Sequence, residues 1–162
     1  MIIREEKKSE HEEVRQLVME AFGQKEEANL VDMLRSAREA VLSLVALEDE
    51  RITGHILFSR MVAPTQTLGL APVSVRPDRQ GSGIGSALIR EGIVRARRSG
   101  WHAVFVLGEP EYYRRFGFHQ ELAANFSSPY AGPYFMAQEL QEGGLGDGMG
   151  DATYASAFSR LG

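Results

Sequence analysis

Three stretches of the chain repeat hydrophobic residues three and four positions apart, which is the spacing of one face of an α-helix. They predict helices over residues 9–22, 25–37 and 83–99. Ser9, three residues before Glu12, is expected to cap the start of the first helix. The buried face of that helix is expected to consist of Val14, Leu17, Val18, Ala21 and Phe22.

Other stretches are short, apolar and rich in β-branched and aromatic residues, which is typical of strands. The predicted strands cover residues 1–5, 41–49, 51–63, 68–77, 101–108 and 133–140. The short polar link "EDER" joins the second and third strands, so we expect them to form an antiparallel hairpin. Pro72 lies inside the fourth strand and has no N–H to donate, which predicts a bulge or a splayed strand end near it.

The remaining segments predict short elements and connections. A short helix is expected within 110–117, a glycine-rich connection over 142–151, and a last strand or edge segment over 153–161. The order of elements places hairpins in the first half and a strand–helix–strand crossover in the middle. This order predicts an α/β (α+β) fold with one mixed sheet and helices on both faces. We expect residues 1–162 to form a single domain.

Composition excludes several classes of protein. The chain has 162 residues, 43% of them hydrophobic, and no cysteine, so it has no disulfide framework, thiolate metal site or cysteine nucleophile. No apolar run approaches the ~20 residues of a membrane span, and the N-terminus turns charged at once, so we expect a cytoplasmic protein without membrane association. The net charge of −4 argues against nucleic acid as a partner.

Positive charge gathers around a run of glycines. Residues 1–50 hold 13 acidic and 7 basic side chains, whereas residues 76–98 hold six arginines and two acidic residues. The glycines of this run are Gly81, Gly83 and Gly85. Arg76 and Arg79 lie beside them, so an anionic ligand is expected to bind here.

Three phosphate-binding motifs compete for the stretch "RQGSGIGS". A Walker A loop needs Gly-Lys followed by Ser or Thr, and the absence of lysine after Lys25 excludes it. A dinucleotide fingerprint needs G-x-G-x-x-G directly after a strand, but here the spacing is G-x-G-x-G and the turn "RPDR" intervenes. A nucleotide-binding α/β domain therefore stays an alternative, which binding of NAD or ATP would reveal. The third motif is Gln80-x-x-Gly83-x-Gly85, which follows the strand "VSVRP" and opens an amphipathic helix.

This third motif resembles that of the GCN5-related N-acetyltransferase (GNAT) superfamily. "VRPDRQGSGIGSALI" is similar to the pyrophosphate loop of that family, and "YYRRFGF" at 112–118 is similar to its second signature. The element order of residues 1–120 also agrees, and the small bacterial predicted N-acetyltransferases are the branch that the chain resembles most. The resemblance implies a mixed, mostly antiparallel central sheet in which the strand near 70–76 splays away from the strand at 101–108.

The resemblance also implies acetyl-CoA as cosubstrate. Glycines let the loop close around a diphosphate without an intervening Cβ, and the first turn of the following helix offers free N–H groups to it. The amides of Val73 and Val75 are expected to bind the pantetheine arm and the thioester carbonyl. The cofactor-binding residues expected from the resemblance are Val73, Ser74, Val75, Arg79, Gln80, Gly81, Ser82, Gly83, Ile84, Gly85, Ser86 and Tyr113.

Two residues are expected to be catalytic. Tyr113 aligns with the tyrosine that protonates the departing thiolate in the family, whereas Tyr112 is expected in the core. Many members carry an asparagine after the preceding strand, and "LGEPEYY" has none, so that contact to the cofactor is in doubt. Glu109 lies in this region and is the candidate general base, followed by His55. No cluster of His, Asp and Glu has metal-ligand spacing, so no metal is expected.

The sequence therefore favours an acetyl-CoA-dependent N-acetyltransferase. Its expected substrate is a primary amine of a small molecule or peptide, acetylated by direct transfer within a ternary complex. The alternative is a catalytically inactive acyl-CoA-binding sensor or scaffold. The two N-terminal helices and residues 121–136 are expected to build the acceptor site, and a homodimer is implied because homodimers are usual in the family.

Overall fold

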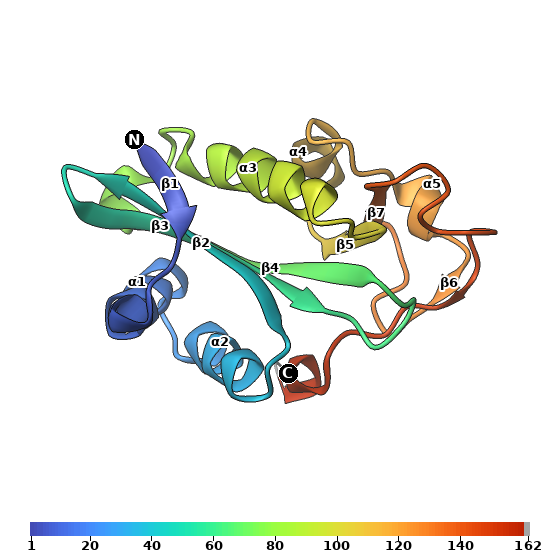
Figure 1. Cartoon of the computed structure of the whole chain (residues 1–162), viewed down its shortest axis with the longest axis horizontal. Coiled ribbons are helices and arrows are strands. Elements are labelled where there is room, and N and C mark those ends of the chain that lie inside the picture. The colour runs from blue at the N-terminus through green and yellow to red at the C-terminus, as the bar shows by residue number, and fades with distance from the viewer. Residues whose placement is uncertain (161–162) are drawn as a thin grey trace.

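The computed structural model describes residues 1–160, and its centre is a twisted six-stranded sheet (Figure 1). The strands lie in the order β1-β2-β3-β4-β5-β7, and only β4 and β5 run parallel. Their bounds are Ile2–Glu5 (β1), Ala40–Glu48 (β2), Arg51–Arg60 (β3), Thr67–Val75 (β4), Ala103–Leu107 (β5) and Phe135–Glu139 (β7). The predicted mixed and mostly antiparallel sheet is thus confirmed, and so is the hairpin of β2 and β3.

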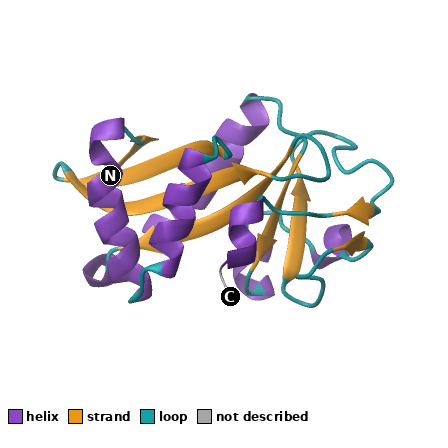
Figure 2. Cartoon of the chain, turned by 90° about the horizontal axis from the view of Figure 1, so that it is seen from below, coloured by secondary structure: helices purple, strands orange, loops and turns teal. Residues whose placement is uncertain are grey.

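Helices cover both faces of the sheet, as expected (Figures 1 and 2). The helices α1 (His11–Phe22) and α2 (Glu26–Ser36) lie on one face, together with the 3-10 helix η3 (Ser156–Arg160). The helices α3 (Ile84–Arg98) and α4 (Pro110–Arg114) lie on the other. Within residues 1–160, no helix combines the length and the apolar character that crossing a bilayer would require.

Small elements complete the chain. They are the 3-10 helices η1 (Lys8–Glu10) and η2 (Pro77–Arg79), the helix α5 (Gln120–Ala123), and a two-stranded sheet of β6 (Phe126–Ser127) and β8 (Gly150–Asp151). The sequence did not predict α5 or β6, because each spans little more than one period, which is too short for a pattern to repeat. The glycine-rich connection over 142–151 consists mostly of turns.

Three expectations differ from the structure. The segment 153–161 forms one bridge, between Thr153 and Ala63, and then turns into η3 instead of a strand; Leu161 lies outside the described residues. Ser9 does not cap α1; it lies within η1, where the Glu10 carboxylate accepts the backbone N–H of Lys7 at 2.8 Å. Phe22 is not buried but 41% exposed, because it closes the last turn of α1 beside Gly23.

β4 carries the irregularity that Pro72 predicts. Ile56 of β3 faces Val73, and Phe58 faces Leu70, so two residues of β4 lie opposite one residue of β3. On its other side β4 pairs with β5 over three residue pairs only, which end at Gly69 and Phe105. Beyond that point the two strands diverge, and the predicted splay is confirmed.

Two close contacts seat α3 on the sheet. A Cβ at Gly54 of β3 would lie 2.7 Å from Cγ2 of Ile84, which is the first residue of α3. A Cβ at Gly92, halfway along the helix, would overlap the ring of Phe58. These contacts fix the height and the rotation of α3, and therefore the position of the loop that precedes it.

The Phe58 contact can be tested by two alanine substitutions in the same helix. Gly92→Ala and Gly85→Ala both gain helix propensity, but only the first forces a methyl group into a ring, since Cβ at Gly85 has ordinary contacts from 3.5 Å. We expect Gly92→Ala to unfold with a free energy about 2 kcal/mol lower than Gly85→Ala, as overpacking costs of about 1–3 kcal/mol indicate. Urea unfolding measures both, and equal stabilities would show that Phe58 does not seat the helix.

Candidate active site

The free edge of β4 is the first part of the site. The amide of Arg76 donates to the carbonyl of Thr53 in β3 at 2.9 Å. Because hydrogen-bonded pairs alternate along antiparallel strands, Ser74 also directs its backbone groups to β3. The N–H and C=O groups of Val73 and Val75 therefore point to the opposite edge, where β5 has already diverged. Backbone donors without a strand partner are available to a ligand there.

The loop after β4 folds back over this edge. The side-chain amide of Gln80 donates to the carbonyl of Val75 at 3.1 Å, which ties the loop to the end of the strand. The hydroxyl of Ser82 donates to the carbonyl of Arg79 at 2.5 Å and closes the turn. Gly81 and Gly83 have φ of 79° and 88°, in the left-handed region that side chains disfavour. The glycines are thus required by the path of the backbone.

The loop ends at the N-terminus of α3, whose first turn has unsatisfied donors. Gly83 is the N-cap and has no side chain to cap the helix, and the first intrahelical bond runs from the N–H of Ala87 to the Gly83 carbonyl. The N–H groups of Ile84, Gly85 and Ser86 consequently have no partner within the helix. Ile84 is buried beneath this turn and anchors it to the core. Free N–H groups and the positive end of the helix dipole favour an anion here.

A cavity of about 290 Å³ lies between the loop, β4 and α4. Its walls contain five of the residues expected from the sequence: Val73, Val75, Gln80, Gly85 and Tyr113. The other lining residues are Tyr112 and, from the end of α1, Ala21 and Phe22. The structure therefore brings the glycine loop and the distant "YYRRFGF" segment to one place. Ser74 is not part of this wall, because its side chain is buried on the other face of β4.

Tyr113 is the most strongly perturbed group of this cavity. Its ring packs on Gly108, where a Cβ would overlap it, and edge-to-face on Phe118 at 5.7 Å between ring centres. Burial, with a smaller contribution from the Tyr112 hydroxyl, raises the pKa of Tyr113 to about 12. The phenol therefore keeps its proton across the neutral range and can act as a donor. The Tyr112 hydroxyl lies 3.4 Å from the Ser86 hydroxyl, so Tyr112 belongs to the cavity as well as to the core.

Both arginines beside the loop are already paired with carboxylates. Arg79 binds both carboxylate oxygens of Glu48 at 2.8 Å, and this pairing lowers the pKa of Glu48. Arg76 donates to the Ile52 carbonyl at 2.6 Å and pairs with Glu20 of α1 at 3.2 Å. The two arginines thus tie the loop to the β2–β3 hairpin and to α1.

The two candidate bases do not line the cavity. Glu109 is exposed; its carbonyl accepts the N–H groups of Tyr112 and Tyr113 and so starts α4. His55 is fully buried on the α1 side of the sheet, where its Nε2 lies 2.8 Å from the Ser43 hydroxyl. Burial is the main cause that lowers the pKa of His55 to about 3. An imidazole with that pKa is a weak base at neutral pH.

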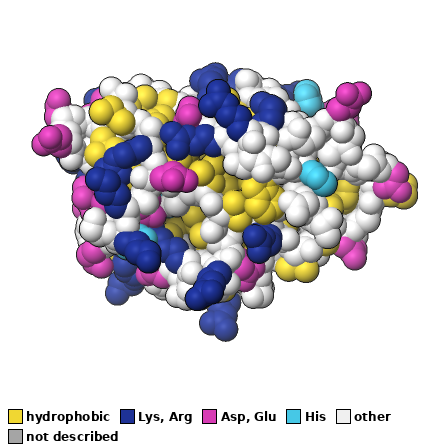
Figure 3. Space-filling view, in the orientation of Figure 1, with side chains coloured by type: hydrophobic (Ala, Val, Ile, Leu, Met, Phe, Trp, Pro, Cys, Tyr) yellow, Lys and Arg dark blue, Asp and Glu magenta, His cyan; other side chains and the backbone are white. Residues whose placement is uncertain are grey.

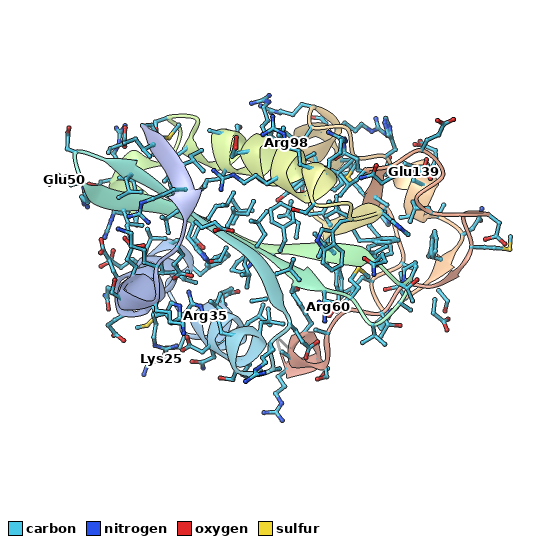
Figure 4. All side chains as sticks on the ribbon, in the orientation of Figure 1. Lys25, Arg35, Glu50, Arg60, Arg98 and Glu139 are labelled. Atoms are coloured by element: carbon cyan, nitrogen blue, oxygen red, sulfur yellow. The ribbon has the colours of Figure 1, made fainter. Side chains whose placement is uncertain are left out.

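His55 ends a chain of buried polar groups. Ser43 donates to Glu6 at 2.7 Å, and the other oxygen of Glu6 pairs with Arg35, which lies between α2 and the sheet (Figure 4). His55 Nδ1 and the Ser74 hydroxyl, on neighbouring strands, have no partner among the described residues. Arg35 also pairs with Asp32 at 3.4 Å, so the chain links the sheet to the surface of α2.

Charges are unevenly spread around the site. In Figure 3 basic and acidic side chains crowd the end of the molecule that holds α1 and the β2–β3 hairpin, and hydrophobic side chains show along the middle of that face.

Among residues 1–160, no group of three or more His, Asp or Glu side chains is placed to hold a metal ion.

Phe22 and Tyr154 are two of the cavity residues that the sequence reasoning placed elsewhere. Phe22 lies on the apolar face of a helical pattern, which predicts that its side chain is buried. Only its position in the last turn of α1 indicates that the side chain can be exposed. Tyr154 lies in a segment expected to be an edge strand, yet it lines a second cavity of about 780 Å³ beside the splay. Tyr130 of the segment 121–136 lines that second cavity, whereas α1 and α2 do not.

Most of the chain is similar in sequence to known proteins. Residues 9–118 match the acetyltransferase (GNAT) family. The uncharacterized N-acetyltransferase YjhQ of Escherichia coli (strain K12) is 42% identical over 141 residues, which are 82% of this chain and 75% of YjhQ.

Two crystal structures are similar over almost the whole chain. The GNAT family N-acetyltransferase YhbS of Escherichia coli, in complex with CoA, has a TM-score of 0.91 at 30% identity and covers 99% of this chain and 93% of its own. A GNAT family acetyltransferase of Brucella melitensis, in complex with acetyl-CoA, has a TM-score of 0.81 at 38% identity and covers 97% of both chains.

Burial of His55 predicts a specific loss of stability in mild acid. As the pH falls below about 6.5, the unfolded chain binds a proton on this imidazole, whereas the folded chain does not until about pH 3. The free energy of unfolding should therefore decrease by up to about 1.4 kcal/mol per pH unit in this window because of His55. His55→Gln, which can still bond to Ser43, should flatten the decrease between pH 6.5 and 5.

Urea unfolding at several pH values measures this slope. His102 is exposed, so His102→Gln is the matched control and should leave the slope unchanged. Glu10, whose bond with Arg4 lowers its pKa from 4.5 in the unfolded chain to about 2, takes up its proton below pH 5 and does not affect the slope between pH 6.5 and 5. Equal slopes in the wild type and in His55→Gln would contradict the prediction.

Proposed function

The chain belongs to the acetyltransferase (GNAT) family, and we propose that it transfers an acetyl group from acetyl-CoA to a primary amine by direct transfer in a ternary complex. The observation that carries the proposal is the convergence of three features on one cavity: the free β4 edge, the glycine loop at the start of α3, and Tyr113. The CoA complex of YhbS and the acetyl-CoA complex of the Brucella melitensis protein support the choice of cosubstrate.

The loop and the first turn of α3 fit a diphosphate. In the proposal, the N–H groups between Gly81 and Ser86 bind the pyrophosphate, with the Ser82 and Ser86 hydroxyls beside them. Gln80 holds the loop on the strand end. Arg79 keeps the loop in place through its pairing with Glu48 rather than as a direct ligand of the phosphates, since both oxygens of that carboxylate already engage its guanidinium.

The β4 edge fits the pantetheine arm and the thioester. Val73 offers its amide and carbonyl and Val75 its amide, at the spacing of an extended strand, and an extended arm can bond to them as a neighbouring strand would; the Val75 carbonyl already accepts from Gln80. Ser74 between them was expected to bind the cofactor, but its backbone groups point to β3 and its side chain is buried, so it contributes only the spacing between Val73 and Val75. A donor aimed at the thioester carbonyl also stabilises the negative charge that develops on its oxygen.

The reaction exchanges one bond for another. The lone pair of the neutral amine attacks the carbonyl carbon; the C–N bond forms, the C–S bond breaks, and the nitrogen releases one proton. Tyr113 donates a hydrogen bond and then its proton to the departing sulfur. The apolar surroundings of Tyr113 raise the pKa of its phenol, and they also disfavour a thiolate that carries no proton. The departing sulfur therefore needs a proton donor at this position, and the Tyr113 hydroxyl provides it. Glu109, at the start of α4, remains the candidate base that takes the proton of the nitrogen; because it does not line the cavity, it acts through water.

We also propose that the chain acts as one acetyltransferase domain, because the sheet takes strands from Ile2 to Glu139 and η3 packs on α2. The cytoplasmic location and the homodimer expected from the sequence stay predictions.

Binding of CoA tests the loop. Gly83→Ala forces a side chain onto a backbone with φ of 88°, which strains the loop and moves its N–H groups. We expect calorimetry to show at least a tenfold loss of CoA affinity. Gly100→Ala is the matched control, since Gly100 has φ of 87° and equally open surroundings but lies beyond the far end of α3. It should lose similar stability and keep its affinity for CoA; equal affinity losses would contradict the assigned site.

Turnover tests the chemistry. Release of CoA thiol from acetyl-CoA is measured with a panel of primary amines, and the best substrate is then used with Tyr113→Phe. We expect kcat to fall about 100-fold, within the range of general acid catalysis, while the affinity for CoA changes less than threefold because the ring still packs on Gly108. Tyr112→Phe should have a much smaller effect. Tight CoA binding without transfer to any amine would favour the sensor alternative.

A further inference from the structure

A second and larger cavity opens on the other side of the splay. It has a volume of about 780 Å³. Its main walls are Leu70, Ala71, Leu107, Tyr130, Tyr154 and Phe158. The remaining lining residues are proline, alanine, serine and threonine, so the part of its wall that lies within residues 1–160 carries no charged side chain. A cavity of this size and character suits a small organic molecule with an apolar body.

Tyr154 fixes the back of this cavity. Its ring lies on Gly69, the last residue of β4 that pairs with β5, where a Cβ would overlap it. It packs on Phe158 at 5.0 Å and on Tyr130 at 5.3 Å between ring centres. These rings come from the two segments that follow β5 and close the open side of the splay. The aromatic wall is therefore built against the point at which β4 and β5 separate.

The second cavity lies next to the first along the same strand edge. Ala71 lines the second cavity, and Val73, two residues further along β4, lines the first. Burial raises the pKa of Tyr154, and the neighbouring hydroxyls of Tyr130 and Tyr113 raise it further, so Tyr113 lies within electrostatic reach of the aromatic wall. A molecule in the second cavity would thus meet the thioester beside Tyr113.

We propose that this cavity holds the acceptor, and that the acceptor is a primary amine on an uncharged aliphatic or aromatic body; this rests on the proposed function. Contact with Leu70, Leu107 and the aromatic rings removes the apolar surface of such a body from water. A second charge on the body would lose its hydration without a carboxylate to pair with. Polyamines and basic peptides are therefore poor substrates.

The same wall assists deprotonation. Attack requires the neutral amine, and neither cavity is lined by a carboxylate or an imidazole among the described residues. Transfer of an ammonium group from water into apolar surroundings lowers its pKa, so the amine loses its proton to solvent as it enters. Recognition of the apolar body and formation of the nucleophile are thus one event.

Two amines of equal length test the proposal. Hexylamine and 1,6-diaminohexane differ only in a second, charged end. We expect kcat/KM, measured by thiol release from acetyl-CoA, to be at least tenfold higher for hexylamine. Leu107→Arg places a charge at the mouth of the cavity, where Leu107 is 48% exposed, and should lower kcat/KM for hexylamine at least tenfold without changing CoA affinity. Ile2→Arg, at a 65% exposed position on β1, should change neither quantity.

Each outcome decides one question. Equal or better use of the diamine, or an unaffected Leu107→Arg variant, overturns the proposed acceptor. Hexanoyl-CoA tests whether the cavity holds the acyl chain instead of the amine. If hexanoyl-CoA binds more tightly than acetyl-CoA, and the difference is lost in Leu107→Arg, the proposed acceptor site is overturned. Saturation-transfer NMR of hexylamine on the CoA-saturated protein separates the proposed acceptor cavity from the proposed acetyltransferase activity. Hexylamine that binds at this wall without turnover supports the cavity as the amine site and contradicts the proposed activity. Absence of hexylamine binding contradicts the cavity as the amine site.

Discussion

Parallel pairing between β4 and β5 stops at Gly69 and Phe105, and the whole site depends on this early stop. A strand inside a sheet normally spends its amides and carbonyls on both neighbours. Beyond Gly69, β4 has β3 on one side only, so its other edge can bind a ligand as if that ligand were the next strand. Pro72 has no N–H to donate, and the bulge against β3 interrupts the regular path of β4 just beyond Gly69. The sequence of β4 is therefore consistent with the gap that opens there.

The helix that follows β4 turns this gap into a site that favours an anion. A crossover from β4 through α3 to the parallel strand β5 places the start of α3 beside the end of β4. Gly54 and Gly92 let the helix come close to β3 and to Phe58, so its free N–H groups lie at a fixed height above the open edge. Arg95, Arg97 and Arg98 in the last turn match the opposite end of the helix dipole. A helix that sat higher would not bring its first turn near Val75.

Much of this arrangement could be predicted from local pattern. Pro72 predicted the irregular strand, and the glycines of "RQGSGIGS" predicted a loop that closes without an intervening Cβ before a helix, in which Gly81 and Gly83 have positive φ. What failed depended on contacts between distant segments. The pairing of Arg79 with Glu48 joins residues 31 apart, and no spacing rule reveals it. Tyr154 follows a glycine-rich connection whose path is set by turns, so its place on Gly69 was invisible in the sequence. Phe22 matches a buried helical face, and only the end of α1 exposes it.

The two walls of the splay have opposite chemistry, and Tyr113 stands where they meet. On one side the β4 edge and the first turn of α3 supply backbone donors for an anionic ligand, and on the other side aromatic rings and apolar side chains disfavour charge. In the proposed complex the pyrophosphate lies at the start of α3, and the thioester and the amine meet where the walls become apolar. Such surroundings suit an uncharged thioester and a neutral amine. Negative charge forms first on the carbonyl oxygen and then on the departing sulfur, and the raised pKa of Tyr113 keeps a proton available to that sulfur at every physiological pH.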